Sequence, residues 1–195
     1  MTATSPGITP ARARLLVVAG PSGVGKGTVV RRALELDPSI WLSVSATSRS
    51  PREGERDAVD YFFLTPAQFE ERARNGAMLE WARFAGNLYG TPLEAVEERL
   101  AAGTPVLLEI DLAGARQVRA NLPEAVLVFL APPSFEELER RLRGRGTEDE
   151  TSIRRRLGIA GTELEAVDEF DHVVVNDDIE AAARRLVALA HDSRP

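Results

Sequence analysis

A glycine-rich segment near the N-terminus has the residue types and spacing of a phosphate-binding loop. The run Gly20-Pro21-Ser22-Gly23-Val24-Gly25-Lys26 fits the pattern G-x-x-x-x-G-K. Glycines let the backbone wrap closely around phosphate with its N–H groups pointing inward, and the lysine reaches the β- and γ-phosphates of a nucleotide. The segment is therefore predicted to be a Walker A loop that binds ATP.

The lysine of this loop is the only one in the chain, because the other 23 of the 24 basic residues are arginines. Arginine presents a planar fork, whereas lysine presents a compact point charge. Since the sequence uses arginine everywhere else, position 26 is expected to require the ammonium group. We expect Lys26 to be a catalytic residue.

The loop departs from the full motif directly after Lys26. Gly27 stands where the motif has a serine or threonine that ligates Mg²⁺, and the hydroxyl is one position later, on Thr28. This ending is similar to that of adenylate kinases. Residues 20–28 are therefore expected to bind ATP, with Mg²⁺ held mainly by the ATP phosphates and water and with Thr28 as the candidate ligand, directly or through water.

The surrounding elements must place this loop between a strand and a helix. Residues 14–19 form a short apolar run typical of a buried parallel strand, and a helix is expected from about Lys26 to a point before Pro38. This is the context that the motif requires.

The rest of the chain continues the alternation of strands and helices. Further strands are expected at 41–45, 105–110, 125–131 and 172–175, and helices at 112–121 and 179–191. Thr65 and Thr91, each followed by a proline, are expected to cap two more helices. The expected fold class is α/β, a P-loop NTPase-type parallel sheet flanked by helices.

Composition limits the remaining possibilities. The chain has 195 residues, a net charge of −6 and no cysteine, which excludes disulfides and cysteine-based metal or redox chemistry. The acidic balance argues against a nucleic-acid partner. Without a membrane span or export signal, a cytoplasmic protein is expected, as a monomer or small homo-oligomer, with residues 1–12 as a disordered leader.

Further segments resemble, in order, the signatures of guanylate kinases, a family of P-loop nucleoside monophosphate kinases. They are 43–55, 60–63, 80–82, 86–91, 109–111, 131–134, 144–147 and 175–178. The resemblance runs from about residue 13 to 190. It implies in-line transfer of the γ-phosphoryl group of ATP, with Mg²⁺, to GMP, giving ADP and GDP in purine nucleotide metabolism.

The resemblance also implies roles for individual residues. The implied GMP site consists of Ser45, Arg49, Arg52, Tyr61, Glu80, Tyr89, Thr91, Glu109 and Asp111. Arginine and tyrosine donors suit the GMP phosphate, and Arg49 is also expected to be catalytic. Glu80 and Asp111 are expected to face the guanine, whose N1 and N2 groups donate hydrogen bonds that carboxylates accept.

Arginines are concentrated in the segment after residue 134. By resemblance, Arg145 and Arg156, and then Arg141, are expected to contact the transferring phosphoryl group, while Asn176 and Asp177 are candidates to contact adenine. The implied domain spans 13–192, with a core (13–44, 92–134 and 157–192), an inserted acceptor-binding (GMP-binding) subdomain (45–91) and a short helical lid (135–156). Closure of the last two over the core is expected to exclude water.

Two alternatives remain open at this stage. A related P-loop kinase acting on another small phosphorylated acceptor would keep the loop but would not need Glu80 and Asp111 to face a purine. A non-catalytic guanylate-kinase-like module that binds phosphopeptides usually has a degraded loop, whereas the loop here is intact.

Overall fold

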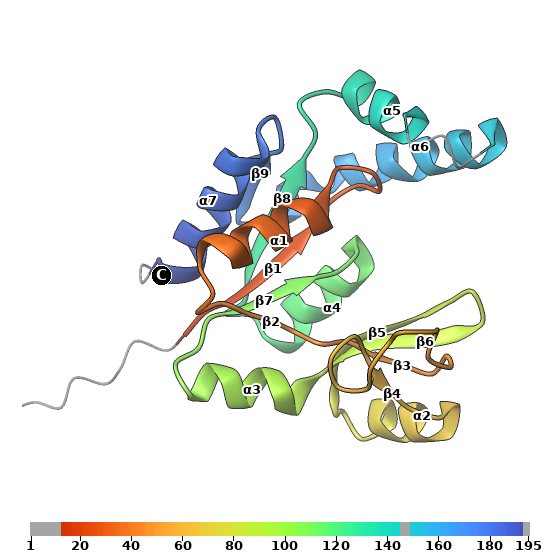
Figure 1. Ribbon diagram of the computed structural model, residues 1–195, viewed down its shortest axis with the longest axis vertical. Coiled ribbons are helices and arrows are strands. Elements are labelled where there is room, and N and C mark those ends of the chain that lie inside the picture. Colours follow the sequence, from red (N-terminus) through yellow and green to blue (C-terminus); the bar gives the residue numbers. More distant parts are fainter. Residues whose placement is uncertain (1–12, 145–148, 193–195) are drawn as a thin grey trace, which may run out of the picture.

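A parallel β-sheet forms the centre of the molecule in the computed structural model, which describes residues 13–144 and 149–192. Its five strands are arranged in the order β2-β7-β1-β8-β9, and every neighbouring pair is parallel (Figure 1). The strands are β1 (Leu15–Ala19), β2 (Trp41–Leu42), β7 (Val106–Glu109), β8 (Val126–Ala131) and β9 (His172–Val175). The expected α/β class is confirmed.

Helices cover both faces of this sheet because its central strand is apolar on both sides. On β1, Leu16 and Val18 face one core cluster, while Leu15 and Val17 face the other. The first cluster contains residues of α1 (Lys26–Leu36) and α7 (Ile179–His191), and the second those of α3 (Leu93–Ala101) and α4 (Leu112–Asn121).

A second, smaller sheet is formed within the segment predicted to bind the acceptor. Its strands β3 (Ala46–Thr47), β4 (Phe62–Phe63), β5 (Met78–Phe84) and β6 (Asn87–Pro92) are arranged in the order β4-β3-β6-β5. Helix α2 (Pro66–Arg74) packs against it through Phe69, which is buried with Met78 and Leu88. This unit therefore has a small core of its own.

Two helices follow β8 and return to the glycine-rich loop. They are α5 (Phe135–Arg143), capped by Ser134, and α6 (Glu150–Glu165), capped by Asp149 (Figure 1). A 3-10 turn (Val167–Glu169) then leads into β9. Helix α6 contacts the loop directly, because the backbone N–H of Ser22 donates to the carboxylate of Glu163.

The local predictions were confirmed at one threonine cap and wrong at the other. The Thr65 hydroxyl accepts from the backbone N–H of Gln68, and the Gln68 side chain accepts from the Thr65 N–H. Thr91 instead lies in β6, and α3 begins after it with Pro92 at its N-cap. Its hydroxyl does not cap the helix because it donates to the carboxylate of Glu80.

Two other features differ from the expectations. The strand expected at 41–45 is assigned only over Trp41–Leu42. The β5–β6 hairpin was not predicted; its buried residues Met78 and Leu88 pack against Phe69 of α2 and Ala46 of β3.

The parallel sheet brings the predicted site residues to one edge. The carboxyl ends of β1 and β7 lead into the glycine-rich loop and into Asp111, and β2 leads toward Ser45. In open α/β sheets, ligands bind beyond the carboxyl ends of the strands. Over the described ranges, none of the helices combines the length and the apolar character that crossing a membrane requires.

Candidate active site

The glycine-rich loop has a backbone that only glycine can adopt at two key positions. At Gly20, φ is 152° and an added Cβ would lie 2.2 Å from the carbonyl oxygen of Leu130. Gly25 has a φ of 97° and is the N-cap of α1, which begins at Lys26. The loop therefore leads directly into a helix N-terminus, where backbone N–H groups and the helix dipole favour an anion.

Lys26 lies inside the loop and is surrounded by acceptors. Its Nζ donates to the carbonyl oxygens of Gly20 at 2.6 Å and Pro21 at 3.4 Å. Burial lowers the pKa of Lys26, and the nearby carboxylates of Glu163, Glu109 and Asp111 oppose that change. The ammonium group is thus held at the mouth of the loop by contacts that a polyphosphate can replace.

Helix α6 adds two polar groups to the loop at Ser22. Glu163 accepts from the Ser22 N–H at 3.2 Å, and Arg156 donates to the Ser22 hydroxyl at 2.7 Å. Burial raises the pKa of Glu163 against the opposing effects of the Ser22 N–H and Lys26. The structure therefore places Arg156 at the loop, together with Glu163, which was not predicted from the sequence.

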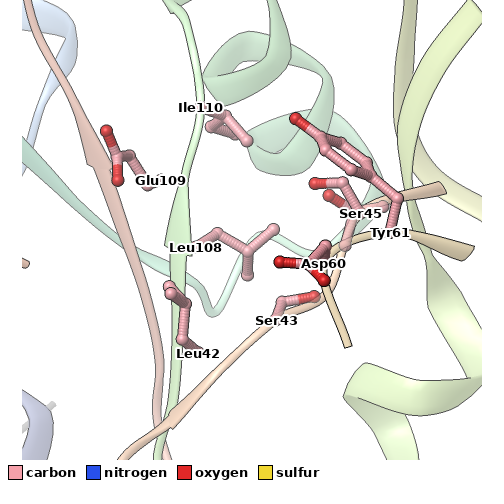
Figure 2. A pocket seen from close by; sticks show the side chains of 9 residues that line it. Leu42, Ser43, Ser45, Asp60, Tyr61, Leu108, Glu109 and Ile110 are labelled. Atoms are coloured by element: carbon pink, nitrogen blue, oxygen red, sulfur yellow. The ribbon is translucent and has the colours of Figure 1, made fainter. Parts of the chain in front are cut away.

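A cavity of about 400 Å³ lies beside the loop and collects most of the predicted acceptor residues. It is lined by Ser45, Arg49, Arg52, Tyr61, Glu80, Ala82, Phe84, Tyr89, Gly90, Glu109, Ile110 and Asp111. An adjoining pocket of about 210 Å³ shares Ser45 and Tyr61 and also includes Thr91 (Figure 2). All nine residues of the predicted acceptor site thus line one or both of two adjoining pockets.

Two carboxylates meet at one part of this cavity. Glu80 is only 7% exposed, and its Oε1 accepts from the Thr91 hydroxyl at 2.6 Å. Burial raises the pKa of Glu80, and the negative charge of Asp111 adds to that rise. Asp111 caps α4 by accepting from the Gly114 N–H at 2.7 Å, which leaves its second oxygen for another donor.

Arginine and tyrosine side chains gather at another part of the cavity. The two tyrosines of the chain, Tyr61 and Tyr89, have ring centroids 6.3 Å apart, and the Arg49 guanidinium lies 4.9 Å from the Tyr61 centroid. Arg49 donates two hydrogen bonds to Glu55, at 2.6 and 2.7 Å. Those bonds lower the pKa of Glu55 to about 2. Glu55 orients Arg49, a role that the sequence analysis did not assign.

Glu109 differs from the other predicted acceptor residues in its direction. Figure 2 shows its carboxylate on the opposite side of β7 from Ser45 and Tyr61. An added Cβ on Gly27 would lie 3.5 Å from Glu109 Oε1, so this carboxylate faces the glycine-rich loop. Desolvation raises the pKa of Glu109 above its ordinary value, and the positive charges of Lys26 and Arg31 oppose part of that rise. The geometry therefore associates Glu109 with the donor side of the site.

Two of the remaining predicted residues support the loop from behind. Arg141 donates to the carbonyl oxygens of Val24 at 3.2 Å and of Asn176 at 2.9 Å. The Asn176 side chain also donates to Val24, at 2.7 Å. Asn176 is buried, and its side chain contacts the backbone of the loop.

The last predicted residues make none of the contacts described above. Asp177 and Thr28 are exposed. Arg145 lies outside the described residues. Within the described ranges, no group of three or more His, Cys, Asp or Glu side chains could hold a metal ion. Mg²⁺ usually keeps several water ligands and binds through substrate phosphates.

Comparison with known proteins places this arrangement in a family. The family model for guanylate kinase matches residues 12–192. A guanylate kinase of Synechococcus sp. (strain CC9311) is 62% identical over 174 residues, covering 89% of this chain and 92% of that protein. A guanylate kinase of Streptomyces coelicolor is 58% identical over 188 residues, covering 96% and 95%.

A solved structure shows the same likeness in three dimensions. The crystal structure of guanylate kinase from Anaplasma phagocytophilum superposes with a TM-score of 0.70 at 34% sequence identity, covering 91% of this chain and 84% of that one. The chain belongs to the guanylate kinase family.

Proposed function

We propose that the protein transfers the γ-phosphoryl group of ATP to GMP, giving ADP and GDP. The observation that carries this proposal is the pairing of two sites at one sheet edge. A phosphate loop containing the single lysine of the chain lies beside a cavity that combines an arginine–tyrosine cluster with two carboxylates. The first site suits a polyphosphate donor, and the second suits an acceptor with both a phosphate and a guanine.

The cavity matches GMP at both ends. Arg49, Arg52, Tyr61 and Tyr89 provide donors for a phosphate dianion, and arginine forks bind such groups well. Glu80 and Asp111 accept from the guanine N1 and N2 groups, because an ionised carboxylate is an acceptor only. Adenine has an acceptor at N1 and would leave the second oxygen of each carboxylate without a donor from the base.

The chemistry needs charge neutralisation and alignment more than proton transfer. An oxygen of the GMP phosphate is already ionised at neutral pH. It forms a bond to the γ-phosphorus as the bond from that phosphorus to the bridging oxygen of ADP breaks. Lys26 stabilises the charge that moves onto the transferring group, with Arg156 approaching from α6. Arg141 and Arg145 stay candidates for the same role.

The residues near Gly27 fit a Mg²⁺ ion that arrives with ATP. Gly27 lacks the hydroxyl of the full motif, but the carboxylate of Glu109 faces it, and the hydroxyl of Thr28 follows it. Oxygen donors of this kind suit Mg²⁺, which usually keeps several water ligands. When bound, Mg²⁺ would neutralise part of the phosphate charge. We propose that Glu109 and Thr28 contact it through water.

The alternatives are less consistent with these findings. The intact loop and its partly buried lysine are not needed by a phosphopeptide-binding module. A kinase for a different acceptor would not need both carboxylates in the cavity. We further propose that ATP and GMP are the only partners required, in the cytoplasm, without nucleic acid or membrane and as a monomer or small homo-oligomer.

An acceptor panel tests the proposal. ADP release would be measured with ATP, Mg²⁺ and each of GMP, IMP, AMP, CMP and UMP. We expect GMP to have the highest kcat/KM and to exceed AMP by a factor of about 10⁴, because AMP would leave the buried carboxylate of Glu80 without a donor from the base. Comparable turnover of AMP and GMP would contradict the proposal.

A further inference from the structure

A side chain of α4 binds the backbone of β5 immediately after Glu80. The Gln117 Nε2 donates to the carbonyl oxygen of Trp81 at 3.0 Å, and the Gln117 Oε1 accepts from the Trp81 N–H at 3.1 Å. One amide group therefore satisfies both backbone groups of a single residue. Trp81 follows Glu80 directly in the strand.

This contact pairs backbone groups of an edge strand that no neighbouring strand can pair. In the sheet order β4-β3-β6-β5, strand β5 lies at the edge, so one row of its backbone groups has no strand partner. Gln117 pairs with Trp81 on that side, and the Asn121 Nδ2 donates to the carbonyl oxygen of Leu79 at 2.8 Å. The backbone is thus held on both sides of Glu80 by one helix.

The same helix face also contacts the Glu80 carboxylate and carries its partner. An added Cβ on Gly114 would lie 2.9 Å from Glu80 Oε2, so the Glu80 carboxylate lies directly against this position of the helix. Asp111 is the N-cap of α4. Positions 111, 114, 117 and 121 are separated by three or four residues, so they share one face of the helix.

We propose that Gln117 is a positioning residue that sets the separation of Glu80 and Asp111 and thereby the selectivity for guanine. The proposal rests on the role assigned above to the two carboxylates. Glu80 belongs to the smaller sheet, whereas Asp111 follows a strand of the central sheet. The amide of Gln117 connects these two units beside the base-reading pair.

Loss of this connection should affect guanine reading before it affects folding. Gln117 is partly exposed, so its removal opens no cavity in the core. A misplacement of about 1 Å at a binding group can lower the rate by a factor of about 100. We therefore expect Gln117→Met to lower kcat/KM for GMP by about 10- to 100-fold, mainly through KM, and to reduce the preference for GMP over IMP.

The neighbouring residue provides a matched control. Arg116 is also on α4, and its side chain makes two hydrogen bonds of 2.7 and 2.6 Å, but to Glu169 instead of β5. Arg116→Met also removes a pair of hydrogen bonds from the same helix. We expect it to leave KM for GMP and the GMP/IMP preference within about twofold of wild type, since no group near the carboxylates moves.

The experiment measures kcat and KM for GMP, IMP and ATP in wild type, Gln117→Met, Arg116→Met and Glu80→Gln, with circular dichroism to verify folding. A rise in KM for GMP with an unchanged KM for ATP supports the proposal. If Gln117→Met does not fold, Asn121→Leu removes the neighbouring bond to Leu79 and should change KM for GMP in the same direction.

Three results would contradict the proposal in different ways. If Glu80→Gln reduces the GMP/IMP preference but Gln117→Met behaves like Arg116→Met, the positioning role is wrong and the base-reading role stands. If Glu80→Gln leaves the preference unchanged, the base-reading role itself is wrong. An equal loss toward GMP and ATP in Gln117→Met would indicate general damage and would also overturn the positioning role.

Discussion

Replacing Glu80 by glutamine tests how the protein recognises guanine. The substitution keeps the size of the side chain but exchanges one acceptor oxygen for an NH₂ group. Glu80 is 7% exposed, and its Oε1 already accepts from the Thr91 hydroxyl at 2.6 Å. The glutamine oxygen can keep that bond, so its NH₂ group would face the N–H donors of guanine.

The magnitude follows from the two interactions that change. A hydrogen bond to a charged group contributes about 1.5–3 kcal/mol, and a buried donor left unpaired costs about 1–3 kcal/mol. Together these give about 2.5–6 kcal/mol, a factor of about 10² to 10⁴ in kcat/KM for GMP. The KM for ATP should change by less than about twofold, because the glycine-rich loop does not contact Glu80 directly.

The same substitution should raise the thermal stability of the protein although it lowers activity. Burial raises the pKa of Glu80 above its ordinary value of 4.5, so the folded protein resists ionising this group. Ionisation of Glu80 in the folded protein therefore lowers the free energy of unfolding. This loss is absent below pH 4.5 and develops as pH rises through the raised pKa. Glu80→Gln should therefore unfold at a higher temperature than wild type at pH 7, with the difference disappearing in acid.

The assay compares initial rates with GMP, IMP and AMP for the two proteins and adds thermal unfolding at several pH values. Glu70→Gln is the control, since it makes the same chemical change on the exposed face of α2. A Glu80→Gln protein with unchanged kcat/KM for GMP would refute the reasoning. So would a loss of activity that follows a loss of folding.

Three further predictions concern the donor site and the approach of the two substrates. Lys26→Arg should abolish transfer without unfolding the protein, because the Lys26 ammonium lies 2.6 Å from the carbonyl oxygen of Gly20 in a space shaped for a point charge. Turnover near that of wild type would contradict this prediction. Glu163→Gln should lower KM for ATP by about two- to tenfold, because it weakens a carboxylate contact to the Ser22 N–H that competes with phosphate. An increase in KM for ATP would show that Glu163 assists binding instead. GMP with a non-hydrolysable ATP analogue should reduce the radius of gyration in small-angle scattering, because the acceptor-binding sheet must approach the loop to exclude water; an unchanged radius would argue against closure.

The parts of the site that were predictable from sequence are those encoded within a short segment. The phosphate loop follows a buried strand and precedes a helix, so the spacing of Gly20, Gly25 and Lys26 was sufficient to locate it. The cap at Thr65 depends on a residue three positions away and was also predictable. The individual acceptor residues came from the family resemblance, because a lone Arg or Glu carries no such local pattern.

The contacts that were missed join residues far apart in the chain. Thr91 has the local pattern of a helix cap, but a carboxylate 11 residues away on the paired strand accepts its hydroxyl. Glu163 lies 141 residues from Ser22, and Gln117 lies 36 residues from Trp81. Nothing in the sequence around these polar residues distinguishes them from ordinary helix-surface residues, because their partners are set by how the elements pack.

The most direct test of the central claim is to follow the transferred phosphoryl group. ATP labelled with ³²P at the γ-phosphate would be mixed with Mg²⁺, GMP and excess wild-type protein in a single turnover, and the products separated. We expect the label to appear in the β-phosphate of GDP, and we expect Lys26→Arg to form no labelled GDP. Release of the label mainly as inorganic phosphate would contradict the proposed transfer. If AMP is added as a second acceptor, formation of labelled ADP as readily as labelled GDP would also contradict it.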